Sequence, residues 1–403
     1  MLAALRSRDF RLLWAGQSVS VIGDGLLVVA VGLFVTRLTG DPRDVGVVLA
    51  AYALPLVLLL LVGGVVADRL PRHVLMMISD VVRGLAHAVL AVLIGTGAVR
   101  VWHLVVIGIV FGTAQAFFQP AYSGLVPQTV AEPDIQAAQA LGGISRELST
   151  FVGPALATVL VLTYGGAVAF AVDAATFAVS ALTLAWVRPR PRGEAGERSD
   201  VLAELREGWA AVRSRAWVWA PIAATGAAIL LALAPFFVLG PAVSRQQYGT
   251  EAVYGVANVA WGLGTITGAL VAARWRPHRP LRAMVLAGAA WPATIALFGS
   301  GAPTALVYPV TAACGVGMGL YGVWWETALA QRIPPHLLSR VSAWDWAGSL
   351  ALLPLGYLLA GSVARAVGEV PVLVAGGVVG TAALASILLA PSVRSLQRIE
   401  QPA

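Results

Sequence analysis

The sequence contains no lysine, a single cysteine and few charged residues, which make up 12% of its 403 positions. A soluble domain of average composition carries about 25% charged residues. Hydrophobic residues account for 58% of the chain instead. The lone cysteine, Cys314, excludes a disulfide framework and a cysteine-based metal site. This composition predicts that lipid, and not water, is the main solvent of the protein.

The motifs of enzymes and of nucleotide-binding proteins are also missing. The five histidines form no H-E-x-x-H pair, and the chain has no G-x-x-x-x-G-K-[ST] loop. The 27 basic residues, all arginine, do not gather on one hydrated face as nucleic-acid binding would require. We therefore expect no enzyme activity, no cofactor, no metal and no nucleic-acid partner, and we do not expect ATP to be the direct energy source.

Long apolar runs are abundant. A helix needs about 20 predominantly apolar residues to cross the hydrocarbon core of a bilayer, and its backbone amides must be bonded within the segment. Twelve such runs predict an all-α polytopic membrane protein with twelve transmembrane helices. Their approximate limits are 12–37, 45–67, 74–95, 102–125, 138–163, 166–187, 217–240, 252–273, 281–299, 303–329, 341–364 and 370–390.

The arginines predict the orientation of these spans. Loops on one side carry 20 of the 27 arginines and loops on the other carry five, while Arg83 and Arg146 fall inside spans. Cytoplasmic loops retain positive charge, so we expect both termini in the cytoplasm of a bacterium and the spans in its cytoplasmic membrane. The first apolar run is longer than a signal-peptide core and is expected to remain as a span.

One long hydrophilic stretch divides the spans into six and six. We expect an N-terminal bundle over 1–187, a cytoplasmic linker over 188–216 and a C-terminal bundle over 217–403. Apolar residues recur at helical spacing inside the linker, which indicates a short amphipathic helix at the membrane surface. These residues are Leu202, Leu205, Trp209 and Val212.

The two halves of the chain resemble each other. Gly63 and Arg69 after the second span match Gly268 and Arg274 after the eighth, an offset of about 205 residues. Six spans per half and a shared pattern predict a parallel duplication. We therefore expect two six-helix pseudo-repeated bundles around a central cavity, an arrangement that lets the bundles rock about one site.

The loop after the second span carries a recognisable motif. Residues 64–73 read G-V-V-A-D-R-L-P-R-H, which resembles the G-x-x-x-D-R-x-x-R-R motif of the major facilitator superfamily and departs from it only at His73. The runs F-F-Q-P-A at 117–121, G-P-A-L at 153–156 and S-R-V at 339–341 are similar to the branch that contains enterobactin exporters and macrolide efflux pumps.

This resemblance implies a function. It implies a monomeric secondary active transporter, an antiporter that exports small organic molecules by alternating access with protons as the coupling ion. The expected substrates are drugs, antibiotics or siderophore-like compounds. The alternatives are an importer or facilitator of a small solute, and a membrane receptor that does not transport.

By the same resemblance, Gly64, Asp68, Arg69 and Arg72 form a gating motif in which Asp68 takes part in a charge lock rather than in substrate contact. The alternative is that the arginines only anchor the topology.

Ionisable residues inside spans are costly and therefore suggest function. Asp24 lies near the middle of the first span between Gly23 and Gly25, so we expect it to alternate between its protonated and charged forms and to couple proton movement. The alternative is a structural partner of a neighbouring group. Arg146 in the fifth span is expected either to pair with Asp24 or to hold an anionic substrate.

Other ionisable groups inside spans are expected to be structural. Asp80 and Arg83, three residues apart on one helical face, predict an ion pair. Asp173 is expected to lie away from the cavity, and His87 to be a packed histidine. Gly153 and Pro154 resemble, in degraded form, the G-P motif of drug and proton antiporters and predict close packing and a kink in the fifth span.

Two further sets of candidates complete the predicted site. Aromatic rings and amides on the expected cavity-lining spans suit bulky, partly apolar substrates; these are Gln17, Tyr52, Gln115, Gln119, Asn258, Trp261, Trp324, Trp325 and Trp344. The alternative for the tryptophans is anchoring at the membrane interface. A cytoplasmic gate is expected to contain Glu326, Arg340 and Asp345.

Overall fold

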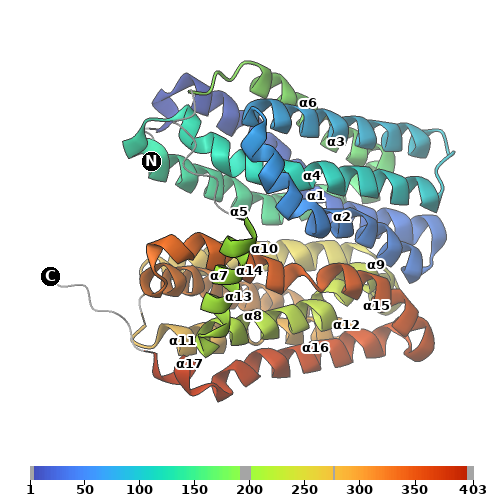
Figure 1. The fold of residues 1–403 in the computed structure, drawn as a ribbon. Helices are drawn as coiled ribbons and strands as arrows, with labels where there is room; N and C mark the ends of the chain where they lie inside the picture. The colour runs from blue at the N-terminus through green and yellow to red at the C-terminus, as the bar shows by residue number, and fades with distance from the viewer. Residues whose placement is uncertain (1–3, 191–200, 276, 397–403) are drawn as a thin grey trace. The chain divides into compact units, whose positions relative to one another are not determined.

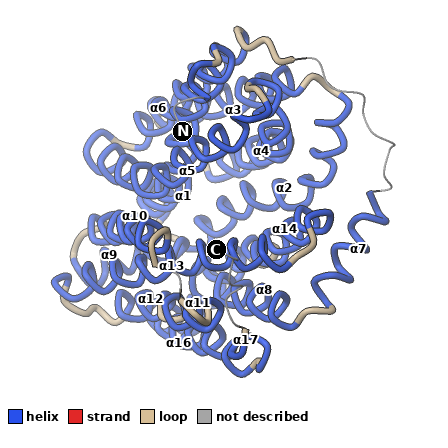
Figure 2. Tube along the Cα trace, turned by 90° about the vertical axis from the view of Figure 1, so that its left-hand side faces the viewer, coloured by secondary structure: helices blue, strands red, loops and turns tan. Residues whose placement is uncertain are grey.

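The computed structural model describes residues 4–190, 201–275 and 277–396, and these residues form helices and loops without any strand. The chain divides into two compact units, Met1–Ala195 and Gly196–Ala403 (Figure 1, Figure 2). Twelve helical segments of the described chain are long and apolar enough to cross a membrane. The predicted number of spans is therefore confirmed, with six in each unit.

The first unit consists of six membrane-spanning helices and short connecting turns. Its fifth helix ends in a π-helical turn at Leu160–Tyr164. The helices are α1 (Arg8–Thr39), α2 (Pro42–Arg69), α3 (Arg72–Gly95), α4 (Val101–Thr129), α5 (Ile135–Val159) and α6 (Gly166–Ala185).

Three helix pairs organise the first unit: α1 with α5, α2 with α4, and α3 with α6 (Figure 1). Glycines allow the closest of these approaches. A Cβ atom on Gly112 of α4 would lie 2.1 Å from the carbonyl oxygen of Tyr52, and one on Gly63 of α2 would lie 2.2 Å from that of Ala116. Helices in lipid associate through such small residues because the lipid removes the hydrophobic driving force between them.

The second unit contains more helical segments because several of its spans are broken. Its first helix, α7, belongs to the stretch predicted as a linker. The segments are α7 (Val201–Arg213), α8 (Ala216–Ala228), α9 (Ala234–Tyr248), α10 (Ala252–Ala272), α11 (Pro280–Gly288), α12 (Trp291–Gly299), α13 (Thr304–Arg332), α14 (Pro335–Leu350), α15 (Leu353–Val367), α16 (Glu369–Ser386) and α17 (Pro391–Ser395).

Prolines account for the breaks. Pro235 follows a π-helical turn at Ile229–Leu233 that joins α8 to α9. Pro292 and Pro354 stand at the starts of α12 and α15, just after the breaks in the ninth and eleventh spans. A proline lacks the amide hydrogen and its ring clashes with the carbonyl of the preceding turn, so it weakens a helix and favours a kink or a break there.

Helix pairing in the second unit repeats that of the first. The helices of the eighth and tenth spans, α10 and α13, pack together as α2 and α4 do, and α12 packs against α16 as α3 does against α6. A Cβ atom on Gly268 would lie 2.0 Å from the carbonyl oxygen of Val316, the same kind of contact that Gly63 makes. The shared pairing agrees with the predicted duplication.

The outer faces of the helices suit lipid. Leu58, Leu85 and Leu182 are each more than 60% exposed on helices α2, α3 and α6. Exposed leucines in such number would be unfavourable in water. In a bilayer the same faces contact acyl chains.

Candidate functional site

A cluster of charged side chains is buried inside the first unit. Arg83 of α3 occupies its centre. Its Nη1 donates to Asp24 of α1, at 3.2 Å from Oδ1, and to Oε1 of Gln115 on α4. Its Nη2 donates to Oδ1 of Asp80, one helical turn away on α3. The predicted ion pair between Asp80 and Arg83 is present, and Asp24 joins it from another helix.

Aromatic rings enclose the guanidinium of Arg83. Its central carbon lies 4.3 Å from the ring centroid of Phe118, 4.4 Å from that of Phe177 and 5.7 Å from that of Phe111. Rings at these distances attract a cation through their quadrupoles. They also exclude water, which strengthens the interaction between Arg83 and its carboxylate partners.

The other oxygen of Asp80 is held by α6 and α1. Ser180 donates to Asp80 Oδ2 at 2.5 Å, and Gln17 Nε2 donates to Ser180 Oγ at 2.6 Å. All three residues are buried. Because both oxygens of Asp80 have charged or polar donors, this carboxylate is fixed in place.

A second buried group adjoins the first. His87 Nδ1 lies 2.6 Å from Oδ2 of Asp173, and His87 Nε2 lies 3.2 Å from the hydroxyl of Tyr52. A Cβ atom on Gly23 would lie 2.2 Å from Oδ1 of Asp173, so Asp173 lies against the residue next to Asp24. His87 is packed, as expected, and is also bonded to the carboxylate of Asp173.

We refer to Asp24, Asp80, Arg83, His87 and Asp173 as the charge cluster. Arg83 and Asp80 have side chains that are 0% exposed, whereas the side chain of Asp24 is 22% exposed. His87 and Asp173 are buried. Asp24 is thus the member that a proton or a solute can reach most directly.

The two glycines beside Asp24 allow other helices to come close. A Cβ atom on Gly25 would lie 2.5 Å from the carbonyl oxygen of Ser149, and one on Gly153 would lie 2.3 Å from the carbonyl carbon of Gly25. Helix α5 therefore crosses α1 at the residue after Asp24. The Gly153 and Pro154 pair, predicted as an antiporter-like kink, lies at this crossing, and α5 runs through Pro154 to Val159.

Arg146 does not pair with Asp24, whose ion pair is with Arg83. The side chain of Arg146 makes no hydrogen bond or ion pair with the described residues, and the residue is exposed. It lines a small pocket in the first unit together with Gln17, Gln119 and Tyr122. Two of the residues predicted for substrate contact, Gln17 and Gln119, are therefore neighbours of Arg146 in this pocket.

The remaining candidates of the first unit lie elsewhere. Gln115 bonds to Arg83 and Tyr52 to His87, so both belong to the surroundings of the charge cluster.

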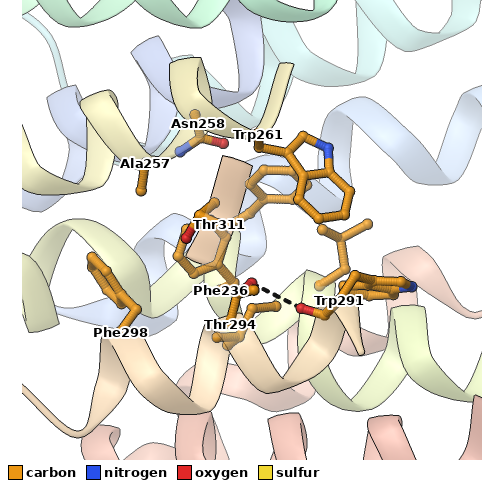
Figure 3. A pocket seen from close by; sticks show the side chains of 11 residues that line it. Phe236, Ala257, Asn258, Trp261, Trp291, Thr294, Phe298 and Thr311 are labelled. Atoms are coloured by element: carbon orange, nitrogen blue, oxygen red, sulfur yellow. Dashed lines mark hydrogen bonds between the residues drawn. The ribbon is translucent and has the colours of Figure 1, made fainter. Parts of the chain in front are cut away.

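Asn258 and Trp261 of α10 line a pocket in the second unit (Figure 3). Aromatic residues from α9 and α12 form much of its wall. The ring centroids of Trp261 and Trp291 are 6.0 Å apart with the rings nearly perpendicular. These two predicted substrate residues thus lie together.

The other tryptophans are engaged with their own unit. The indole nitrogen of Trp324 donates to the carbonyl oxygen of Trp275 at 3.2 Å. Trp344 packs against Trp209 of α7, with ring centroids 5.0 Å apart. Neither lines the two pockets described above.

The residues predicted for a cytoplasmic gate have the following partners in the second unit. Arg340 forms an ion pair with Glu207 of α7. Asp345 accepts a hydrogen bond of 2.7 Å from the indole of Trp325. Glu326 is exposed. Helix α7 is therefore attached to α14 by a charged pair and by the contact of Trp209 with Trp344.

The motif loop is described in part. The side chain of Asp68 and the surroundings of Gly64 lie outside the described part of the chain, so the predicted charge lock stays a prediction. Arg69 is exposed, and Nη1 of Arg72 donates to the carbonyl oxygen of Gly124 on α4.

Among the described residues, no group of His, Cys, Asp or Glu could hold a metal ion.

Comparison with known proteins identifies the family. A sequence profile of the Major Facilitator Superfamily matches residues 13–349. The chain belongs to the Major Facilitator Superfamily. It is thus a multi-pass membrane transporter, and the proteins of this family are in general not enzymes.

Curated relatives within the superfamily are efflux proteins. The chain is 24% identical to macrolide efflux protein A of Streptococcus pyogenes, over 89% of this chain and 90% of that protein. It is 28% identical to the multidrug efflux pump Tap of Mycolicibacterium fortuitum, over 86% of this chain and 87% of that protein. The resemblance to the macrolide efflux branch is confirmed.

Solved structures share the fold. The nucleoside transporter NupG superposes with a TM-score of 0.70 over 95% of this chain and 98% of its own, at 12% identity. A bacterial homologue of the human lysosomal transporter Spinster, in an inward-facing and unoccupied conformation, gives 0.66 over 94% and 93% at 12% identity. At this identity the likeness concerns the fold alone.

Proposed function

We propose that this protein is a proton-coupled exporter of small organic molecules in a bacterial cytoplasmic membrane, monomeric, with both termini in the cytoplasm. The efflux relatives support export, and the arginine distribution supports the orientation. Proton coupling is supported by the charge cluster, in which Asp24 is the carboxylate that exchanges the proton.

One observation carries the coupling proposal: carboxylates outnumber cations in the cluster. Asp80 is matched by Arg83, and Asp173 is matched by His87 when that imidazole is protonated. With Asp24 also ionised, three carboxylates share two cations, and the cluster carries one surplus negative charge. An unmatched charge inside a membrane protein is costly, so either a proton or a cationic group that arrives at Asp24 lowers the free energy of the cluster.

The arrangement also keeps the cluster intact when Asp24 changes state. If Asp24 is protonated, Arg83 still bonds to Asp80 and Gln115. If Asp24 is ionised, Arg83 bridges two carboxylates. Arg83 therefore keeps a counter-ion in both states of Asp24. A buried cation without a counter-ion would cost about 3–5 kcal/mol, and proton exchange on Asp24 avoids this cost.

Asp24 also lies where the backbone of α1 meets α5, at Gly25 and Gly153. A change in the charge or hydration of Asp24 acts on this close crossing directly. Alternating access needs a discrete rearrangement to which the ion site is coupled. The close backbone contact between α1 and α5 can be either formed or broken, so it is suited to such a rearrangement.

The test uses Asp24→Asn in everted membrane vesicles with an imposed proton gradient. Transport of erythromycin and of ethidium is measured with and without a protonophore, and Asp134→Asn, in the turn before α5, is the matched control. The wild type and the control should show protonophore-sensitive transport, whereas Asp24→Asn should fall to the level of vesicles without the protein at equal expression.

Protonophore-sensitive transport that is unchanged in Asp24→Asn would remove Asp24 from coupling. Wild-type transport that proceeds down a substrate gradient and ignores the proton gradient would refute proton coupling as a whole.

A further inference from the structure

Three buried side chains form a hydrogen-bonded chain that joins helices α2, α3 and α6 next to Asp24. The hydroxyl of Tyr52 on α2 lies 3.2 Å from His87 Nε2, and His87 Nδ1 lies 2.6 Å from Asp173 Oδ2. The side chain of His87 is 0% exposed and that of Asp173 is 1% exposed. Both ring nitrogens of this histidine therefore have a protein partner.

The partners of His87 fit both charge states of the imidazole. An ionised carboxylate only accepts hydrogen bonds, so Nδ1 carries a hydrogen while Asp173 is ionised. The Tyr52 hydroxyl can either donate to a bare Nε2 or accept from a protonated one, because a hydroxyl is both donor and acceptor. When Nε2 takes up a proton, the hydroxyl only has to turn, and the chain loses no hydrogen bond.

The groups around His87 decide which charge state is favoured. The ionisable ones are Asp24 of α1, Tyr52 of α2, Asp80 and Arg83 of α3, and Asp173 of α6. Helix α4 contributes the ring of Phe111, which stacks on the imidazole with centroids 4.6 Å apart and attracts a cation to its face. Arg83 alone opposes a second cation, and it already has two carboxylate partners. The carboxylate of Asp173 therefore favours the imidazolium.

The charge of Asp24 sets this balance. With Asp24 ionised and His87 neutral, three carboxylates face the single cation Arg83, which leaves two surplus negative charges. A proton on either Asp24 or His87 reduces the surplus to one. The ring of Phe177 lies 4.4 Å from the guanidinium of Arg83 and 6.3 Å from the imidazole, so the same apolar wall keeps water from both groups. Charges in such surroundings interact more strongly than in water.

From these observations we propose that His87 is a second proton-binding residue of this protein, in competition with Asp24. Nε2 supplies the electron pair for the new N–H bond, and the proton comes from solvent. An ionised Asp24 favours the imidazolium, and a protonated Asp24 favours the neutral ring. As a part of transport, this role rests on the proposed function; as a proton-binding site, it is tested without transport.

The experiment is solid-state NMR of the purified full chain in lipid bilayers, with ¹⁵N in the histidine rings. Spectra are recorded between about pH 5 and pH 8, the range in which histidine normally changes its charge. Ring-nitrogen shifts distinguish the imidazolium from the neutral tautomers. The chain has five histidines, so the signal of His87 is assigned by its loss in His87→Gln. If that variant does not fold, the signal is assigned by its retention when the other histidines are replaced by Gln.

Neutralising Asp24 should weaken proton binding at His87. In Asp24→Asn the imidazolium should give way to the neutral ring about one pH unit lower than in the wild type, on the order of a tenfold loss of proton affinity. The matched control Asp134→Asn should not move this midpoint. Tyr52→Phe should lower the midpoint as well, because the imidazolium then has no acceptor at Nε2, whereas Tyr164→Phe, at an exposed position, should not.

Vesicle transport gives an independent measurement. A glutamine at position 87 can donate to Asp173 and accept from Tyr52, but it never carries a charge. Asp24 should then hold its proton more tightly, so the pH dependence of transport by His87→Gln should move about one pH unit towards alkaline pH. His103→Gln, at the start of α4, should leave the profile unchanged.

Two NMR results would overturn the inference: a wild-type His87 that is neutral over the whole pH range, or an imidazolium that is equally populated in the wild type and in Asp24→Asn. If His87 responds to Asp24 but the vesicles show no proton-coupled export, the proton-binding site stands and the proposed function fails. If export is proton-coupled and His87 stays neutral, only this inference fails.

Discussion

Replacing Arg83 by methionine removes the guanidinium of the charge cluster and keeps an unbranched side chain between Phe118 and Phe177. Asp80, whose side chain is 0% exposed, then loses its counter-ion. Asp24 loses its ion-pair partner as well. The perturbation therefore isolates the contribution of one buried cation.

The size of the effect follows from the burial of the pair. Removing one partner of a buried ion pair costs about 3–5 kcal/mol, because the other charge stays behind without compensation. In a unit of this size about 1 kcal/mol corresponds to about 2–4 °C in Tm. We expect the apparent Tm of Arg83→Met to fall on the order of 10 °C, and Arg43→Met, at an exposed position of α2, to change it little.

A second substitution makes the test specific. In the double variant Arg83→Met with Asp80→Asn, the fully buried carboxylate next to the missing cation is also gone and the partly exposed Asp24 remains, so more than half of the lost Tm should return. The assay is thermal unfolding of the detergent-solubilised fusion to a fluorescent protein, followed by size-exclusion chromatography at one heating rate for all variants.

Two results would refute this reasoning. The first is an Arg83→Met protein whose Tm lies within about 2 °C of the wild type, well below the change expected from a buried pair. The second is a double variant no more stable than Arg83→Met, which would show that the loss came from packing and not from an uncompensated charge.

Two glycine substitutions give further expected outcomes. Gly153→Ala should lower both the Tm and the transport rate, because its Cβ would lie 2.3 Å from the backbone of Gly25. Its control, Gly143→Ala on the same helix, has nothing within 4 Å of the added Cβ and should be neutral or slightly stabilising. Equal effects of the two substitutions would contradict the close contact between α1 and α5 at Gly153. Gly124→Ala should displace the Arg72 guanidinium, whose central carbon a Cβ would meet at 2.2 Å. Its transport rate in vesicles should fall with little change in Tm, and an unchanged rate would show that this contact has no part in transport.

Some features of the site could be found in the sequence. The spacing of Asp80 and Arg83 placed both on one face of α3, and two glycines marked Asp24 as unusual. These are local signals, since side chains three or four residues apart on a helix are neighbours whatever the fold. The contact of Asp24 with Arg83 joins residues 59 positions apart, and no local pattern indicates it.

The sequence by itself determined the helical class, the twelve spans and the two similar halves. It could do so because lipid leaves the backbone few alternatives to a helix, and because each span needs an apolar run of about the same length. The motif at 64–73 indicated the family, because it is a local pattern of residues that can be read without the fold.

Only the tertiary structure decided which buried charges meet and where space is left. Helices α3 and α6 bring His87 and Asp173 together, and Asp173 lies against Gly23, the residue before Asp24. The pocket beside Trp261 depends on where helices stop at proline. Apolar periodicity shows that a helix is buried in lipid or protein, but the rotation of each helix and the partner it faces are set by packing between distant segments.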